Sequence, residues 1–527
     1  MTAQHEHDPR QDRPWRALAA LVLGFFMIMI DTTIVIVANP SIQTSLDTDT
    51  SSVIWVTSAY LLAYSVPLLV TGRLGDRFGP RRIYLAGLVI FTVASLWCGL
   101  ADVLPGSAIG ELIVARAFQG LGAALLTPQS MAVITRIFPS ERRGAAMGLW
   151  GATAGVATLV GPILGGVLVD ALGWEWIFFI NIPIGVVAFI LAIAFVPRLS
   201  THRHRFDWGG VALSCLGMFL LVFGLQEGEN YDWNGWIVAS IAGGVVVLIG
   251  FVVWQRFNRG EALVPLRIFR DRNFSLASGV MTTVGFSMTA SFVPLIYFLQ
   301  AVRGMTPTES ALMATPSALM TLIGAPLAGR LSDRVHPALL AVPGLLLTSG
   351  GTWLYVAMIS PDIPWGWLLI PSAVQGIGFG FLFSPIASTA TRNLPLSQAG
   401  AGSGVFNTVR QVGAVVGSAA LAALISARID ADLAPIVAQL PPGTSVTQSG
   451  STQLPDVPGL HAAFTDAMRE TLMLPGAVVL VGVVLAVFFA RPRFLRPGAE
   501  PGEAGSTPES AVTAEAAAAE AGSLPER

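Results

Sequence analysis

Long apolar stretches alternate with short polar segments along most of this 527-residue chain. Each apolar stretch is close to the roughly 20 residues that an α-helix needs to cross the hydrocarbon core of a bilayer. The pattern predicts fourteen membrane spans, and because that number is even, both termini are expected on one side of the membrane. The predicted spans are residues 16–38, 52–71, 83–101, 109–131, 145–169, 176–196, 209–226, 236–255, 274–299, 309–329, 338–358, 366–390, 401–426 and 468–490.

The composition agrees with this pattern, because 53% of the residues are hydrophobic and only 12% are charged. Such values are typical of membrane proteins with many spans and exclude an ordinary soluble domain. All 30 basic residues are arginine. Since a Walker A loop requires lysine, the chain cannot be its own ATP-driven motor of that type. Cys98 and Cys215 lie in apolar runs, so we expect them to fill space rather than form a disulfide.

The arginines predict the orientation of the spans. They gather in loops that the fourteen-span topology places on one face, and the positive-inside rule makes that face cytoplasmic. The chain is therefore expected in the cytoplasmic (inner or plasma) membrane with both termini inside. The arginine-bearing segments are residues 10–16, 73–82, 136–143, 198–205, 256–272, 330–334 and 392.

The chain also contains an internal repeat. Residues 119–126 reappear as residues 375–382, and further matches continue at the same offset of 256. Two related halves of this kind are typical of transporters whose substrate site lies between them. The predicted organisation is a cytoplasmic segment 1–15, a first six-helix half 16–206, an inserted two-helix hairpin 207–260, a second six-helix half 261–490 with a flexible external loop at about 428–465, and a disordered cytoplasmic tail 491–527.

Two charges interrupt the apolar spans of the first half. Asp31 in the first span costs about 2.5 to 3.5 kcal/mol on insertion scales, which makes it a functional-site hypothesis. Helical rise places Asp31 and Arg116 at a similar depth, roughly 10 Å below the outer ends of their spans, so the two could meet. The repeat has serine at both equivalent positions of the second half, Ser287 and Ser372. This asymmetry favours a function over a structural need shared by both halves.

Three motifs stand out in the chain. They read Gly72-Arg-Leu-Gly-Asp76-Arg77-Phe-Gly79-Pro-Arg81-Arg82, Arg116-Ala-Phe-Gln119-Gly120-Leu-Gly122 and Gly155-Val-Ala-Thr-Leu-Val-Gly161-Pro162-Ile-Leu-Gly165-Gly166. Together they resemble the major facilitator superfamily, and in particular its fourteen-helix drug:proton antiporter branch. Further matches to that branch are the sequences that begin at Asp31, Trp176 and Asn407.

The resemblance implies the major facilitator fold and a role for most of these residues. Asp31 and Arg116 would couple transport to protons, although a permanent structural ion pair is the alternative. Asp76 would bond to a helix N-terminus in the other half and stabilise the outward-facing state. The glycines and proline of the antiporter motif, Gly155, Gly161, Pro162, Gly165 and Gly166, would permit close packing and a bend. The implied conformational lock comprises Gly72, Asp76, Arg77, Gly79, Arg81, Arg82 and Asp333.

Aromatic and amide side chains in the spans are candidates for an apolar substrate pocket. Arg410, near the midplane, either contacts substrate or braces the two halves. The candidate substrate contacts are Asp31, Phe118, Gln119, Gln129, Phe286, Phe292, Tyr297, Phe379, Phe383, Asn407 and Arg410.

These features predict a proton-coupled exporter of amphipathic, cationic compounds that works by alternating access. A transporter of one metabolite or of a self-made antibiotic is the alternative. A nutrient importer is disfavoured by the antiporter motif, and the chain lacks the residue clusters of a metalloenzyme or of a nucleophilic enzyme. We expect a functional monomer in lipid whose partners are protons and a small molecule, without cofactor, metal or nucleic acid.

Overall fold

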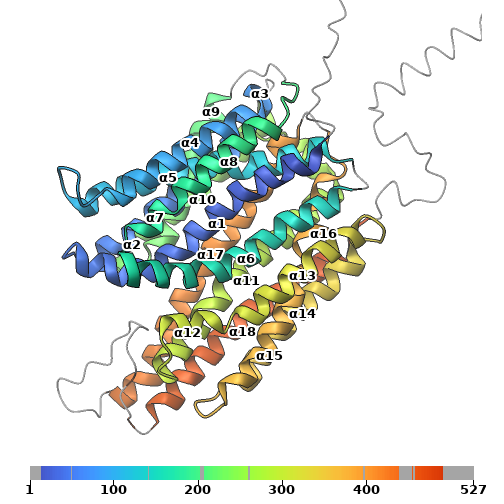
Figure 1. The fold of residues 1–527 in the computed structure, drawn as a ribbon. Coiled ribbons are helices and arrows are strands. Elements are labelled where there is room, and N and C mark those ends of the chain that lie inside the picture. The colour runs from blue at the N-terminus through green and yellow to red at the C-terminus, as the bar shows by residue number, and fades with distance from the viewer. Residues whose placement is uncertain are drawn as a thin grey trace, which may run out of the picture.

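The structure is a computed structural model that describes residues 13–48, 50–139, 142–201, 207–258, 262–395, 398–437, 454, 457 and 459–490. Within these ranges the regular elements are helices, with no strand. Figure 1 shows two bundles of roughly parallel helices, one formed by the beginning of the chain and one by its end. The predicted all-α membrane fold is confirmed.

The first bundle, called the first half below, contains the helices that precede the insertion. Proline or a polar cap marks several of their starts; α4, for example, begins with Pro80 directly after Gly79. The helices are α1 (Pro14–Ser45), α2 (Thr50–Ser65), α3 (Leu68–Phe78), α4 (Pro80–Gly99), α5 (Ala108–Ile137), α6 (Arg143–Leu172), α7 (Trp176–Phe179) and α8 (Asn181–Phe195).

The second bundle, called the second half, follows the inserted hairpin of α9 (Trp208–Gln226) and α10 (Gly235–Phe257). Short turns of other helix types occur beside the hairpin and in the second half, at Glu229–Tyr231, Leu266–Arg270, Phe298–Val302 and Trp365–Leu368. The helices of the second half are α11 (Arg272–Tyr297), α12 (Pro307–Leu312), α13 (Thr315–Ser332), α14 (Ala338–Met358), α15 (Leu369–Gly380), α16 (Phe383–Thr391), α17 (Ala399–Val437) and α18 (Leu460–Val487).

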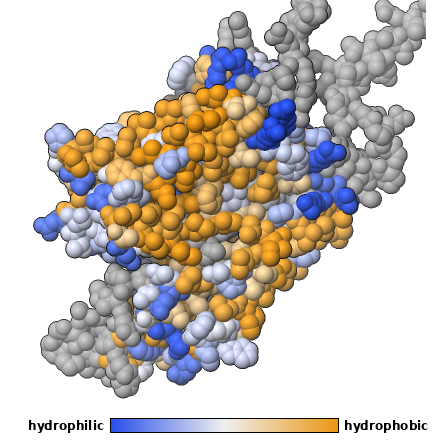
Figure 2. Space-filling model, in the orientation of Figure 1, coloured by the Kyte–Doolittle hydropathy of each residue, from blue (hydrophilic) through white to orange (hydrophobic). Residues whose placement is uncertain are grey.

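Thirteen helices of the described chain are long and apolar enough to cross a membrane. The bent pair of α2 and α3, which meet at 45°, makes a fourteenth span when counted as one. On the face that Figure 2 shows, a wide apolar band crosses the molecule, with hydrophilic residues gathered toward its ends. The chain is a multi-pass membrane protein, as the alternation of apolar and polar segments predicts.

Several helices extend beyond the predicted spans, and in two places this changes the expected structure. The predicted second span ends at residue 71, but α3 continues through the arginine motif to Phe78, so Asp76 lies on a helix and not in a loop. The predicted external loop begins at 428, but α17 continues to Val437 and α18 begins at Leu460. Residues 438–453, the tail 491–527 and nearly all of the segment 1–15 lie outside the described residues.

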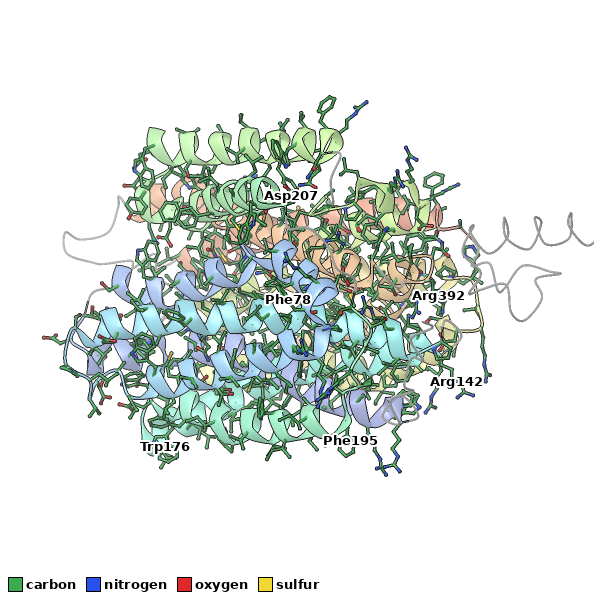
Figure 3. The ribbon with its side chains drawn as sticks, turned by 90° about the horizontal axis from the view of Figure 1, so that it is seen from above. Phe78, Arg142, Trp176, Phe195, Asp207 and Arg392 are labelled. Atoms are coloured by element: carbon green, nitrogen blue, oxygen red, sulfur yellow. The ribbon has the colours of Figure 1, made fainter. Side chains whose placement is uncertain are left out.

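The two halves meet most closely at one end, called here the arginine-rich end because Arg73, Arg136, Arg143 and Arg392 lie there. Figure 3 labels Arg142 and Arg392 at this end and Trp176 toward the opposite one. Helix α3 packs against α17, and α6 packs against α13. In Figure 1 the halves diverge toward the opposite end, and Figure 2 shows a recess between them at that opposite end.

The inserted hairpin lies against the seam between the halves. Met218 and Val222 of α9 are buried together with Leu62 of α2 and Val415 of α17. Helix α9 therefore contacts both the first and the second half, on the side where α2 and α17 approach each other.

Candidate functional site

Asp31 of α1 and Arg116 of α5 form a buried ion pair in the first half. The Arg116 Nη1 donates to the Asp31 Oδ2 at 2.6 Å, and the two side chains are 0% and 1% exposed. The expected meeting of these two charges is thus present in the structure. Burial of both partners makes each dependent on the other, since removal of one partner from a buried pair costs about 3 to 5 kcal/mol.

Two neutral amides complete the surroundings of the carboxylate. The side-chain nitrogens of Gln119 and Asn181 donate to the Asp31 Oδ1 at 2.7 and 2.9 Å. Both nitrogens also lie within hydrogen-bond distance of the Ser95 hydroxyl, at 2.6 and 3.3 Å. Four helices therefore converge on Asp31: α1, α4, α5 and α8.

The Arg116 guanidinium is held on its remaining sides. Its Nε donates to the Val56 carbonyl at 3.2 Å, and Nη1 also donates to the Gln119 Oε1 at 2.6 Å. The guanidinium lies 4.1 Å from the centre of the Tyr60 ring and 5.8 Å from that of Phe178, which is cation–π geometry. The pair thus lies in an enclosed polar site inside the first half.

Sequence reasoning missed Ser95 and Tyr60 and gave Asn181 no role beyond the family resemblance. The available signal was the same one that identified Asp31: an isolated polar residue in an apolar span has to find a partner inside the protein. Hydroxyl side chains are common in spans, however, so only Asn181 carried a useful signal.

The antiporter motif on α6 packs directly against α1 beside Asp31. A Cβ added to Gly165 would lie 2.8 Å from the Ile34 side chain, and one added to Gly161 would overlap the Thr33 hydroxyl. Gly155 faces the other half, where a Cβ would lie 2.7 Å from the Thr321 methyl. Pro162 lies inside the helix, and Gly166 lies near Thr308 of α12. Helix α6 therefore packs against both halves.

Gly161→Ala is expected to destabilise the protein by about 1 to 3 kcal/mol, the usual cost of overpacking a filled interior. Thermal unfolding in detergent would measure the change. Gly350→Ala in α14 is the matched control, because nothing lies within 4 Å of that position and alanine favours the helix. Equal melting temperatures for Gly161→Ala and the parental protein would contradict the close packing of α6 on α1.

Asp76 links the two halves at the arginine-rich end. Its carboxylate accepts hydrogen bonds from the backbone nitrogens of Gly400 and Ala401 at 3.0 and 2.9 Å, at the start of α17. Arg136 donates to it at 2.9 Å, and Arg73 lies 3.9 Å away. A carboxylate at a helix N-terminus is favoured by the unpaired N–H groups and by the helix dipole. The expected bond from Asp76 to a helix N-terminus of the other half is present.

Asp333 makes the equivalent contact from the second half to the first. It follows α13 of the second half and accepts from the backbone nitrogens of Gly144 and Ala145 at 2.8 and 3.1 Å, at the start of α6. Arg392 donates to it at 3.0 Å. Burial raises the pKa of the Asp333 carboxyl, against the lowering effects of these donors and of Arg392. The two carboxylates therefore connect the halves along two separate seams.

The other predicted lock residues make different contacts, and Gly72 is the one that lies at the junction of the halves. A Cβ on Gly72 would meet the backbone of Gly400 and Gly404, so α3 and α17 touch there. Gly79 has a φ of +93° and forms the turn between α3 and α4. Arg81 donates to the Ile193 carbonyl at 2.6 Å, whereas Arg77 lies over Phe78 and Arg82 is exposed.

Three predicted substrate contacts of the first half do not face a common pocket. Phe118 is 49% exposed on α5, where its ring packs beside Trp97. Gln119 is fully buried at Asp31. Gln129 is buried near the arginine-rich end, where it donates to the Thr71 carbonyl at 2.7 Å.

The aromatic candidates of the second half are also separated. Phe286 and Tyr297 pack in a cluster with the outer parts of α17 and α18. Phe379 and Phe383 pack in the largest apolar core, where Phe383 meets Gly151 of the first half. Phe292 is partly exposed. The structure therefore does not bring these side chains into one pocket.

Asn407 and Arg410 of α17 both face the first half. The Asn407 Nδ2 lies 3.8 Å from the Met131 sulfur, while its Oδ1 is buried without a hydrogen-bond partner. The Arg410 Nη2 donates to the Tyr64 hydroxyl at 3.4 Å. Among the described residues no group of three or more His, Cys, Asp or Glu side chains could hold a metal ion.

Comparison with known proteins places this geometry in context. Residues 21–418 match the family model described as Major Facilitator Superfamily. An uncharacterised MFS-type transporter of Mycobacterium tuberculosis is 49% identical over 90% of this chain and 81% of its own. The tetracenomycin C resistance and export protein of Streptomyces glaucescens is 31% identical over 90% of this chain and 91% of its own.

A solved structure supports the fold. The proton:xylose symporter XylE superposes with a TM-score of 0.61 over 91% of this chain and 96% of that chain. The sequences are 13% identical, so the likeness concerns the arrangement of helices alone.

Proposed function

The chain belongs to the Major Facilitator Superfamily, and on that premise we propose that it is a proton-coupled antiporter that exports amphipathic compounds across the cytoplasmic membrane by alternating access. It is a membrane transporter and not an enzyme. The observation that carries the proposal is the enclosed Asp31–Arg116 pair with its two amide neighbours.

This site can satisfy Asp31 in both protonation states. The charged carboxylate accepts from Arg116, Gln119 and Asn181. Rotation of the Asn181 amide would offer a protonated Asp31 an acceptor for its O–H group, the Asn181 Oδ1, which is buried without a hydrogen-bond partner. Arg116 would then retain the Val56 carbonyl and the Gln119 Oε1. The carboxyl thus has hydrogen-bond partners available in both protonation states, which suits a proton carrier.

The lock contacts support the conformational part of the proposal. The halves touch through Asp76 and Asp333 at the arginine-rich end, which the positive-inside rule makes cytoplasmic, and they diverge toward the other end. This arrangement corresponds to an outward-facing state. Inward opening would break both sets of carboxylate contacts.

Asp76→Asn is expected to weaken the outward-facing state and change the rate of cycling without reducing substrate affinity. A helix cap contributes about 0.5 to 2 kcal/mol, which is roughly a two- to thirtyfold shift in the balance between states. Energy transfer between dyes at the outer ends of the halves would measure that balance. Asp333→Asn should add to the effect, since it acts on the other seam. A large loss of affinity with an unchanged balance would contradict this role.

The breadth of substrates separates the proposal from its alternative, a transporter of one compound. The name of the Streptomyces relative mentions a single compound, tetracenomycin C, which gives the alternative some support. Efflux of a panel of unrelated dyes and drugs from cells with and without the protein, before and after collapse of the proton gradient, tests both. Gradient-dependent export of only one chemical class would favour the alternative, and export that ignores the gradient would overturn proton coupling.

The predicted positive charge on the substrate depended on a free carboxylate at Asp31. In the structure that carboxylate is 0% exposed and its oxygens accept from three side chains. The geometry of Asp31 therefore gives a cationic substrate no direct partner in this state.

A further inference from the structure

Arg410 is a charged side chain inside a membrane span. It lies on α17 within the span Ala399–Ile429 and is turned toward α2 of the first half. Its Nη2 has a hydrogen bond of 3.4 Å to the Tyr64 hydroxyl, which in turn donates to the Thr127 Oγ1 at 3.2 Å. Its Nε is buried without a hydrogen-bond partner. The guanidinium therefore has donor capacity left over.

No carboxylate neutralises Arg410 among the described residues, in contrast to Arg116. The ion pairs of the described chain involve Asp31, Asp76, Asp333 and Glu470, each with another arginine. Asp31, the acid buried within the spans of the first half, is already paired with Arg116. An unneutralised arginine in a span is expensive, so its charge calls for a function.

The depth of Arg410 suits a substrate site. Asp76 binds the start of α17 at Gly400 and Ala401, and Arg410 lies about 15 Å further along the helix at 1.5 Å per residue. This position is on the outer side of the closed contacts and near the middle of the membrane. Asn407 lies one turn away, and its Oδ1 is also buried without a partner. The seam between α17 and the first half thus holds a positive charge and an unused amide oxygen.

Aromatic side chains connect this place to the proton site. The Tyr64 and Tyr60 rings are stacked with centres 6.1 Å apart, and the Arg116 guanidinium lies 4.1 Å from the Tyr60 centre. A ligand that displaces the Tyr64 hydroxyl from Arg410 would therefore move a ring that is stacked on Tyr60. Tyr60 in turn packs against Arg116, the partner of Asp31.

We propose that Arg410 binds the anionic group of the substrate, so that the transported compounds are amphipathic organic anions such as carboxylates. The inference rests on the proposed export function and specifies the substrate class of that function. A carboxylate would satisfy the Arg410 Nε and could form a charge-assisted, bidentate pair with the guanidinium. Tyr64 would supply a hydroxyl and an aromatic surface for the apolar part.

Equilibrium binding of two matched dyes tests the proposal. Dansylglycine and dansylcadaverine share the dansyl group, and through its sulfonamide the first carries a carboxylate and the second an ammonium. The purified full-length protein in lipid nanodiscs should bind dansylglycine at least about tenfold more tightly than dansylcadaverine, by fluorescence titration. Arg410→Gln should lose that preference, whereas Arg410→Lys should keep part of it. Because no gradient is present, the result does not depend on proton coupling, and a failure of the export mechanism would leave the preference intact.

Arg428→Gln is the matched control. Arg428 lies further along α17, about two-fifths exposed and paired with Glu470 at 2.7 Å, so its loss should change neither affinity. A parental preference for dansylcadaverine, no binding of dansylglycine, or equal losses in the Arg410→Gln and Arg428→Gln variants would overturn the proposal. If Arg410→Gln does not fold, the parental preference and its retention in Arg410→Lys decide the question.

Discussion

Asp31→Asn is expected to reduce uphill efflux to the level of cells that lack the protein. Asparagine has nearly the same size as aspartate, and its side-chain oxygen can still accept from Arg116, Gln119 or Asn181. Arg116 also keeps the Val56 carbonyl and the Gln119 Oε1. The variant loses the counter-charge of Arg116 and some stability with it, but these remaining partners should let it insert and fold, and what coupling loses is the carboxyl group. Efflux of a fluorescent substrate, measured with and without a protonophore, gives the comparison.

Asp47→Asn is a matched control for this prediction. Asp47 lies two residues after the end of α1 and is exposed, and its φ of 45° suits asparagine as well as aspartate. The control should transport at the parental rate. Gradient-driven efflux by Asp31→Asn at that same rate would remove Asp31 from the coupling mechanism and leave it as a permanent structural ion pair.

The membrane potential is expected to have the second large effect, and its size depends on the charge of the substrate. If one proton enters for each monovalent anion that leaves, two charges cross per cycle. At about 2.3 kcal/mol per charge and 100 mV, the potential then contributes about 4.6 kcal/mol. This free energy corresponds to an accumulation ratio of roughly three orders of magnitude. For a monovalent cation the same stoichiometry moves no net charge. The cationic substrates expected from the sequence would therefore show no effect of the membrane potential.

Proteoliposomes with a clamped pH gradient and an imposed potassium diffusion potential distinguish these cases. Dansylglycine should accumulate when the potential is applied, and dansylcadaverine should respond little. Asp31→Asn should abolish the response to potential, because no proton then crosses through that site. Potential-driven accumulation of dansylcadaverine against its own electrochemical gradient would show that a second proton or another ion is carried in each cycle.

The sequence by itself determined the architecture and the identity of the central acid. Runs of about 20 apolar residues fix where a chain can cross a bilayer. The family model and the relatives confirm the transporter family that the motifs indicated. Asp31 and Arg116 could be paired from helical rise alone, since depth in a membrane depends only on distance along each helix.

The tertiary structure decided which side of each helix faces inward. Phe118 and Gln119 are neighbours in the sequence, yet Phe118 is 49% exposed and Gln119 is 0% exposed against Asp31. The enclosure of Asp31 by Asn181 and the lack of an acid beside Arg410 likewise follow from packing. The physical reason is that lipid and protein interior are both apolar, so a membrane helix has no strong polar face to reveal its orientation. Only the contacts between helices show that Gln119 and Asn181 enclose Asp31 and that Arg410 faces Tyr64.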